Sequence, residues 1–383
     1  MEKIYLDNAA TTEVAKEVIE EIKNKIGIYG NPSSRHSIGK EAKIEIEKAR
    51  EKIAKFIGAK PEEIVFTSGA TESNNFALKG TLMNSNKKHI VISSIEHPAV
   101  IEICEDLKKH GYKISYVNVN KEGIVDPRDV AKAITKETAL VSIMHVNNEI
   151  GTIQPIEEIA KICKKNKVLF HTDAVQSFGK IKIDVNMGID LMSVSGHKIN
   201  ALKGVGFLYI RKGVKISPLI KGGGQEGDLR SGTENVLGII SLAKAIDLKR
   251  KSEEVGKSRD RIEKELIKIP GAKLNGSREK RIYSNITISF YGIEGESLQM
   301  LLDEAGICIS TGSACSSHKL AGSHVLKAID VGEMYLNGNI RISLDSLNVL
   351  SKKQEDYIIK EIKENVERLT KISPFKFGGS NGI

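Results

Sequence analysis

Several candidate strands of this chain end in polar side chains that are able to do chemistry. The five endings are Gly69-Ala70-Thr71-Glu72 after 64–68, Glu96-His97 after 89–94, Asn147-Asn148-Glu149 after 139–144, Asp173-Ala174-Val175-Gln176 beginning at the last residue of 168–173, and Gly196-His197-Lys198 beginning at the last residue of 191–196. Ligands of open α/β sheets bind beyond the carboxyl ends of the strands. Five such endings at one edge therefore predict a binding site there.

The segment Ser68-Gly69-Ala70-Thr71 follows a strand and opens a helix. Backbone N–H groups and the helix dipole make such a turn suited to phosphate. The Gly-Lys-Ser/Thr ending of a Walker motif is missing, so a nucleoside triphosphate is not favoured. An ordinary helix cap is the alternative interpretation, because helix starts often use these residue types.

Lys198 and Asp173 are the two charged residues that suggest a specific cofactor. Placing a lysine at the end of an apolar strand costs free energy unless the lysine has a chemical role. Forming a Schiff base with an aldehyde is one such role. A surface lysine at the start of a loop is the alternative. Asp173 also follows an apolar strand, and a buried carboxylate needs a cationic partner such as a pyridinium nitrogen. Together the pair predicts pyridoxal phosphate, with Gln176 reaching the same face.

The four cysteines, Cys104, Cys163, Cys308 and Cys315, have irregular spacing and include no Cys-x-x-Cys. This argues against a disulfide framework and a structural zinc site. Cys104 and Cys163 occupy apolar helical positions, and Cys308 lies in a candidate strand. Cys315 lies among Gly, Ser and Ala residues without apolar neighbours, so it is the candidate reactive thiol.

Apolar strands alternate with amphipathic helices up to about residue 233, which predicts a buried, mostly parallel sheet flanked by helices. Beyond the strands named above, the predicted elements are helices at 13–26, 38–57, 98–110 and 155–166 and strands at 113–119 and 205–210. A different pattern follows, with a long helical stretch at 234–268, strands at 285–290, 307–310 and 339–344, and helices near 295–305 and at 351–370. We expect a large cofactor-binding domain over 13–255, and a smaller α+β domain from 1–12 and 256–383 that carries the Cys315 loop.

Composition limits the class of protein further. The 383 residues contain no run of 18 apolar residues and no apolar run of signal-peptide length at the start, so no membrane segment is expected. Free thiols suit a reducing cytoplasm. The net charge is +9, but Lys alternates with Glu along helices, which favours a solvated surface over direct nucleic-acid binding. A basic scaffold that binds RNA or an acidic protein partner is the open alternative.

In combination, the motifs resemble those of the cysteine desulfurases, the NifS-like group of the class V aminotransferases and fold-type-I pyridoxal-phosphate enzymes. The resemblance covers nearly the whole chain. Its motifs are YLDNAATT at 5–12, GNPSS at 30–34, FTSGATESNN at 66–75, EHPAV at 96–100, MHVNNEIGTIQPI at 144–156, HTDAVQSFGK at 171–180, SGHK at 195–198, KGVGFLYIR at 203–211, GGGQE at 222–226, RSGTEN at 230–235, STGSACSS at 310–317 and NIRISL at 339–344.

The resemblance implies roles for the cofactor-binding residues. Lys198 would carry pyridoxal 5′-phosphate as a Schiff base and later move the Cα proton. Asp173 would keep the pyridine nitrogen protonated, His97 would stack on the ring and assist proton transfer, and Gln176 would bond the phenolic oxygen. The remaining cofactor contacts implied are Ala70, Thr71, Asn147, Ser195, Gly196, His197 and, from the neighbouring subunit of a homodimer, Thr233.

The resemblance also implies a substrate and a reaction. Arg341 would clamp the carboxylate of L-cysteine, a bidentate task that suits Arg, with Asn147 and Asn31 as further substrate contacts. Cys315, on a mobile loop, would take the sulfur as a persulfide and leave L-alanine. The acceptor would be an iron–sulfur scaffold or a thiolation enzyme, including one for tRNA. No metal is expected in the protein itself, although Cys315 could share an iron–sulfur cluster with a scaffold.

Some alternatives stay open within this interpretation. A selenocysteine lyase or another fold-type-I aminotransferase would share the cofactor site, but an aminotransferase would not need the thiol of Cys315. The chain also departs from the family's pattern at Gly227, Asp228 and Asp345. These departures concern partner choice and turnover, because none of them replaces Lys198 or Asp173.

Overall fold

The computed structural model describes residues 3–311 and 322–378, and Cys315 lies outside them. Its largest sheet has the strand order β2-β8-β7-β6-β5-β3-β4. The strands are β2 (Ile64–Thr67), β3 (His89–Ser93), β4 (Lys113–Val117), β5 (Thr138–Ser142), β6 (Leu169–Asp173), β7 (Leu191–Ser195) and β8 (Gly206–Ile210). Strand β8 is antiparallel to both of its neighbours, and the other pairs are parallel. All strands except β8 therefore run in one direction, and their carboxyl ends share an edge. This confirms the predicted mostly parallel sheet.

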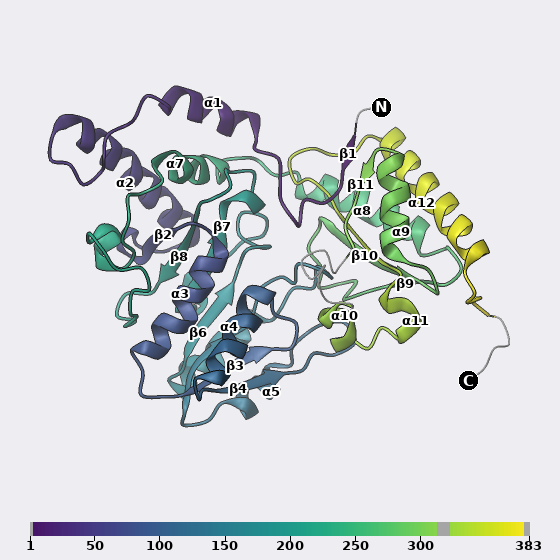
Figure 1. Cartoon of the computed structure of the whole chain (residues 1–383), viewed down its shortest axis with the longest axis horizontal. Helices are drawn as coiled ribbons and strands as arrows, with labels where there is room; N and C mark the ends of the chain where they lie inside the picture. Colours follow the sequence, from purple (N-terminus) through teal and green to yellow (C-terminus); the bar gives the residue numbers. More distant parts are fainter. Residues whose placement is uncertain (1–2, 312–321, 379–383) are drawn as a thin grey trace.

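Both faces of this sheet are covered by helices (Figure 1). On one face pack α1 (Lys16–Lys25), α2 (Ser37–Ile57), α5 (Pro127–Ala133), α6 (Ile156–Asn166) and α7 (Val236–Ala245). On the other pack α3 (Ala70–Met83) and α4 (Pro98–Lys109). Successive strand residues point to opposite faces, so Val141 packs in one core and Leu140 in the other. Burial on both faces explains why these strands are continuously apolar.

The C-terminal part builds smaller sheets. An antiparallel sheet has the order β12-β10-β9, and β1 pairs in parallel with β11. The elements here are β1 (Ile4–Tyr5), α8 (Ser252–Leu266), β9 (Ala272–Leu274), β10 (Asn285–Phe290), α9 (Gly295–Glu304), β11 (Ile307–Cys308), α10 (His324–Ala328), α11 (Glu333–Leu336), β12 (Asn339–Ser343) and α12 (Lys352–Ile372). Helices α8, α9 and α12 share a core with these strands, and β1, α9 and α12 lie on the same side of the molecule (Figure 1).

The single helical stretch expected over 234–268 is wrong, because the chain turns between α7 and α8. At this turn, Arg250 points inward and donates to the carbonyl oxygens of Leu248 and Ile199, and the Lys251 N–H bonds the Ser346 carbonyl. These bonds tie the turn to both parts of the protein. The division into two domains stays a prediction, but the expected boundary at 255/256 falls inside α8. Since Val255 packs in the C-terminal core, we propose a boundary just before this helix.

Within the part of the chain that the structure describes, no helix is both long enough and apolar enough to cross a membrane.

Candidate active site

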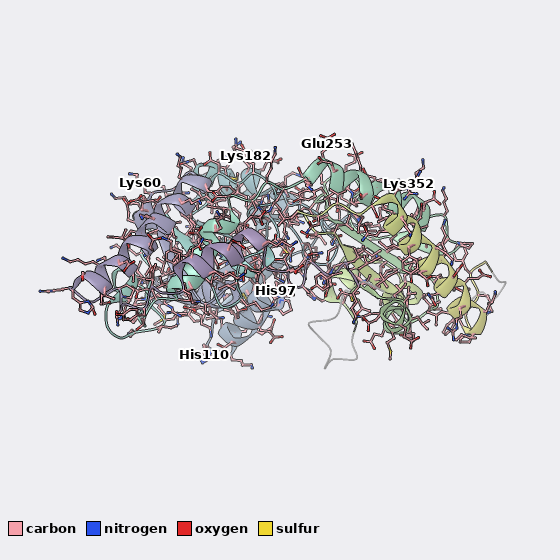
Figure 2. All side chains as sticks on the ribbon, turned by 90° about the horizontal axis from the view of Figure 1, so that it is seen from above. Lys60, His97, His110, Lys182, Glu253 and Lys352 are labelled. Atoms are coloured by element: carbon pink, nitrogen blue, oxygen red, sulfur yellow. The ribbon has the colours of Figure 1, made fainter. Side chains whose placement is uncertain are left out.

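A cavity of about 520 Å³ opens at the shared carboxyl edge of the large sheet. Residues 9–11 of the N-terminal segment and Arg341 of β12 form part of its wall. His97, on this wall, lies near the junction of the two halves of the molecule (Figure 2). The predicted site residues that border the cavity are Ala70, Thr71, His97, Asp173, Gln176, Ser195, His197, Lys198 and Arg341.

One end of the cavity is formed by the start of α3. Gly69, just before the helix, has φ +151°, which residues with a side chain rarely adopt. Gly206 of β8 passes close by, and a Cβ atom there would lie 2.3 Å from the Val194 carbonyl oxygen and 2.8 Å from the Gly69 Cα. The first N–H groups of a helix have no acceptor within it, so Ala70 and Thr71 present donors to the cavity. This end can therefore bind an anion.

The acidic residue of this helix turn is neutralised by an arginine. Glu72 accepts a bond from the Ser68 N–H at 2.8 Å and forms an ion pair with Arg230, also at 2.8 Å. Burial alone would raise the pKa of the Glu72 carboxyl, but the bonds from Arg230 and Ser68 lower it. The Glu72 carboxylate is thus already paired, and it repels a phosphate group less than an unpaired carboxylate would.

Lys198 reaches the cavity from the short helical turn Gly196–Lys198 that follows β7. Its Nζ donates to the carbonyl oxygens of Ala9 at 2.7 Å and Ala10 at 2.6 Å. The Gln176 side chain donates to the same Ala9 oxygen at 2.9 Å, and its own oxygen accepts from Lys180 at 3.2 Å. The N-terminal segment therefore holds an amine and an amide together at one wall.

Asp173 lies at the end of β6 and is 5% exposed. Its carboxylate accepts from the Asn74 side chain at 2.9 Å and from the Val175 N–H at 3.0 Å, both of which are neutral donors. Its charge opposes the lowering of the pKa of the neighbouring His97 ring that burial causes. A buried carboxylate with this surrounding favours a cationic ligand group.

Both histidines predicted for the site have a pKa that burial lowers. Burial, followed by the Lys198 and His324 charges, lowers the pKa of His97 against the opposing effect of Asp173. The Nδ1 atom of His97 accepts from the Ala99 N–H at 3.1 Å, at the start of α4. His197 bonds the Thr11 hydroxyl at 3.1 Å, and burial together with Lys198 lowers its pKa to about 4.

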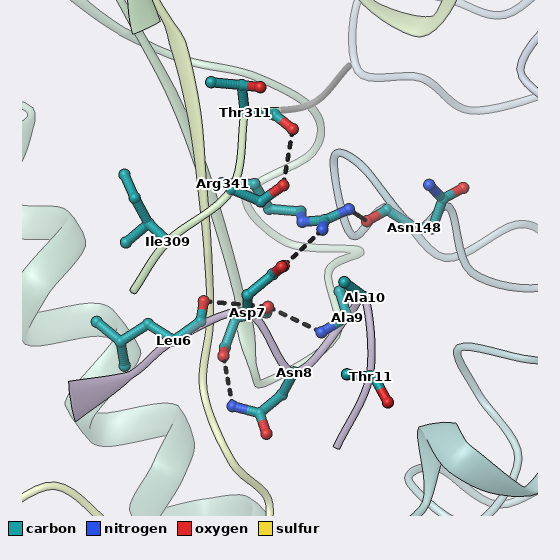
Figure 3. A network of polar contacts seen from close by, with 12 residues as sticks. Leu6, Asp7, Asn8, Ala9, Ala10, Thr11, Asn148, Ile309, Thr311 and Arg341 are labelled. Atoms are coloured by element: carbon teal, nitrogen blue, oxygen red, sulfur yellow. Dashed lines mark hydrogen bonds and ion pairs between the residues drawn. The ribbon is translucent and has the colours of Figure 1, made fainter. Parts of the chain in front are cut away.

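Arg341 brings a guanidinium to the cavity from the C-terminal sheet (Figure 3). It donates to the Asp7 carboxylate at 2.8 Å and to the Asn148 carbonyl oxygen at 3.0 Å. Its buried Nε has no hydrogen-bond partner among the described residues. Because a guanidinium has five N–H donors, this side chain has donors left for a carboxylate ligand.

The sequence profile of the family described as aminotransferase class-V matches residues 4–352. The cysteine desulfurase IscS of Dictyoglomus turgidum is 50% identical, covering 98% of this chain and 97% of that protein. The chain belongs to the class-V aminotransferase family, among its cysteine desulfurases. The resemblance predicted from the motifs is thereby confirmed.

Other comparisons agree with this family membership. The cysteine desulfurase IscS of Methanosarcina thermophila is 47% identical over 97% of this chain and 94% of that protein. A solved NifS-like protein is 41% identical with a TM-score of 0.89, covering 96% of this chain and 100% of the other, which confirms the predicted fold. The solved structure of SspA in complex with cysteine is 38% identical with a TM-score of 0.81, over 90% and 99% of the two chains.

Four predicted site residues of this family member do not border the cavity. Asn147 is 1% exposed, and its side chain donates to the Ile95 carbonyl and accepts from the N–H groups of Glu149 and Ile150. It therefore shapes the turn, and its neighbour Asn148 borders the cavity instead. Gly196 is buried in the turn before Lys198, and Asn31 and Thr233 are exposed elsewhere on the surface.

The wall residues that were not predicted as site residues include three whose side chains bond other residues. Asn74 bonds Asp173, and His324 of α10 bonds the carbonyl of Glu96 at 2.9 Å. Glu149 accepts from the Ser323 hydroxyl, and burial raises its pKa to about 7 against the Ser323 bond and the Arg341 charge. Asn74 and Glu149 lie within sequence motifs already noted, so the sequence could have indicated both as site residues. His324 has no comparable signal, because folding alone brings it to Glu96.

Proposed function

We propose that this chain is a cysteine desulfurase that binds pyridoxal 5′-phosphate and L-cysteine, releases L-alanine and holds the sulfur as a persulfide on Cys315. The observation that supports it most is the pairing of an amine and a buried carboxylate in one cavity. Lys198 and Asp173 both border it, next to the anion-binding start of α3. Few cofactors other than pyridoxal phosphate need this combination.

The residues present fit that cofactor. Lys198 would hold its aldehyde, Asp173 its ring nitrogen, and Gln176 its phenolic oxygen. Ala70, Thr71, Ser195 and His197, which all border the cavity, would hold the phosphate. When bound, pyridoxal phosphate supplies a sink for the electron pair left at Cα of the substrate.

The protein's own groups perform the proton transfers and the binding. With pyridoxal phosphate bound, the amine of Lys198 would accept the Cα proton of the substrate. The carbonyl oxygens of Ala9 and Ala10 keep this amine at the cavity wall. Arg341 binds the carboxylate of the substrate, and Asp7 keeps its guanidinium oriented.

Sulfur transfer requires a second thiol, for which we propose Cys315. Its thiolate attacks the substrate's sulfur, an S–S bond forms, and the bond from sulfur to Cβ breaks. The electron pair of the broken bond stays on the carbon side, which is protonated to give alanine. Cysteine plus thiol thus gives alanine plus persulfide, with no external oxidant or reductant.

We further propose that the protein acts as a homodimer to which each subunit lends Thr233. Thr233 is exposed here, as a residue offered to a second copy would be. Large apolar side chains are also exposed on or next to α1 and α2, and such groups often mark an interface. They include Ile19, Ile26, Tyr29 and Ile44. An iron–sulfur scaffold or a thiolation enzyme in the cytoplasm would then accept the sulfur.

Borohydride reduction followed by peptide mass spectrometry tests the cofactor assignment. We expect the reduced cofactor on Lys198, and Lys198→Ala should abolish the label. Lys203→Ala is a matched control, because Lys203 also borders the cavity but should leave the label in place. A label on another lysine, or none, would refute the assignment.

The same preparation tests the sulfur acceptor. After incubation with L-cysteine, mass spectrometry should find one added sulfur on the Cys315 peptide together with free alanine. Cys315→Ser should lose both, whereas Cys308→Ser, which replaces a partly exposed thiol, should keep both. Alanine production that survives Cys315→Ser would show that the persulfide role is wrong.

A further inference from the structure

The cavity wall carries two imidazole rings whose hydrogen-bond partners assign opposite tautomers. The Nδ1 atom of His97 accepts from a backbone N–H, so a neutral ring carries its proton on Nε2. The Nε2 atom of His324 lies 2.9 Å from the Glu96 carbonyl oxygen, which can only accept. His324 therefore carries its proton on Nε2 and has a lone pair on Nδ1. One ring offers the cavity a donor, and the other offers an acceptor.

Neutral rings are consistent with the surroundings. Burial lowers the pKa of His324, opposed only by its bond to the Glu96 carbonyl. Burial also lowers the pKa of His97, and the charge of each ring would disfavour a charge on the other. Within residues 3–311 and 322–378, Nδ1 of His324 has no hydrogen-bond partner. Its lone pair is thus available to a ligand.

His324 is held rigidly in this position. It begins α10, whose residues Val325 and Leu326 pack against Ile95 and Met144 below the cavity. The preceding Ser323 caps the helix through Leu326 and bonds the Glu149 carboxylate. A side chain fixed by packing and by a backbone bond is suited to accurate placement of a reacting group.

Most other groups of the wall cannot accept a proton from a thiol. In their charged forms Lys198 and Arg341 can donate but not accept, and His97 presents an N–H. Asp173 has the cofactor's ring nitrogen as its proposed partner. The neutral lone pair of His324 remains, and the ordinary pKa of imidazole lies about 2 units below that of a thiol, so proton acceptance is coupled to the transfer of the sulfur. Glu149 is the rival acceptor, next to Arg341.

We propose that Nδ1 of His324 binds the sulfhydryl of L-cysteine and accepts its proton as the sulfur is transferred. The S–H bond breaks, its electron pair stays on sulfur, and an N–H bond forms on the imidazole. The sulfur then remains on Cys315 as the anion of the persulfide. This role rests on the proposed desulfurase function and adds a catalytic residue to it.

Two substitutions of His324 separate this role from a structural one. His324→Gln keeps an amide donor near the position of Nε2, and therefore the Glu96 bond, but removes the acceptor. His324→Asn places an amide near the position of Nδ1, where its oxygen can accept a hydrogen bond but not a proton. Holoenzyme with Cys315→Ser provides a background without turnover, in which ligand binding is followed by the cofactor's visible absorbance.

We expect His324→Gln to bind L-alanine, which has no thiol, within about twofold of the parent but to bind L-cysteine about tenfold more weakly, the loss of one hydrogen bond. With Cys315 restored, kcat/KM for L-cysteine should fall about 100-fold, as for loss of a general base. His324→Asn should bind L-cysteine more tightly than His324→Gln does. Its kcat should nevertheless fall as much as that of His324→Gln, because neither side chain can accept the proton.

Other results would overturn the inference. Unchanged kcat/KM in His324→Gln would exclude proton acceptance, and equal weakening for L-alanine and L-cysteine would show a purely structural role. A fall in L-cysteine binding in Glu149→Gln alone would assign the acceptor to Glu149. If wild-type holoenzyme makes no alanine from L-cysteine, the proposed function itself fails, which is a separate outcome.

Discussion

Replacing Asp7 with alanine should destabilise the protein, because it leaves the Arg341 guanidinium buried without its carboxylate. The Arg341 side chain is 6% exposed and the Asp7 side chain is 20% exposed, and 2.8 Å separates a guanidinium nitrogen of Arg341 from a carboxylate oxygen of Asp7. Breaking a fully buried ion pair costs about 3–5 kcal/mol. Since Asp7 is partly exposed, solvent screens part of this, and we expect about 2 kcal/mol.

This loss translates into a small but measurable change of melting temperature. The unfolding entropy of about 2.1 cal/mol/K per residue gives about 0.8 kcal/mol/K for a chain of this length. A loss of about 2 kcal/mol therefore lowers Tm by about 2–3 °C in a thermal scan. Asp247→Ala is the control, because its partner Lys52 is 40% exposed and such surface pairs contribute about 0–1 kcal/mol.

A ligand carboxylate should compensate for the missing Asp7. Saturating L-alanine should thus raise the Tm of the Asp7→Ala holoenzyme more than that of wild type, by about the same 2–3 °C. An unchanged Tm in Asp7→Ala would show that the ion pair does not stabilise the fold. A Tm loss that L-alanine does not recover would show that Arg341 does not bind the carboxylate.

Three other predictions follow from the same structure. Gly206→Ala should lower the free energy of unfolding by about 1–3 kcal/mol in a denaturant titration, since its Cβ would meet the Val194 oxygen at 2.3 Å, whereas Gly27→Ala has no neighbour within 4 Å and should not. Burial raises the pKa of Glu149 to about 7, so the contribution of its protonated form to stability is complete below the ordinary pKa of the carboxyl and is lost as the pH rises through 7. Between pH 5 and 8, the free energy of unfolding of Glu149→Gln should therefore fall by about 2 kcal/mol less than that of wild type. Parallel curves of this free energy against pH would contradict the prediction. Thr233→Ala should weaken retention of pyridoxal phosphate on dialysis about tenfold if a second subunit supplies this hydroxyl, and unchanged retention would remove Thr233 from the site.

The sequence alone determined the residues that share the edge of the large sheet. Asp173 and Lys198 follow apolar strands, and parallel strands end at one edge whatever their order. The pairing of a carboxylate with an amine could therefore be predicted before any contact was known. The same reasoning predicted most strands to within two residues, since strands buried on both faces need continuous apolar runs.

Only the tertiary structure decided which distant groups complete the site and which near ones are excluded. Arg341 and His324 reach the cavity because the C-terminal part folds against the large sheet, and no spacing encodes that contact. Adjacent Asn147 and Asn148 have the same chemistry, yet turn geometry buries one and presents the other. Local pattern specifies an element and its direction, whereas side-chain orientation in a turn depends on packing between segments far apart in the chain.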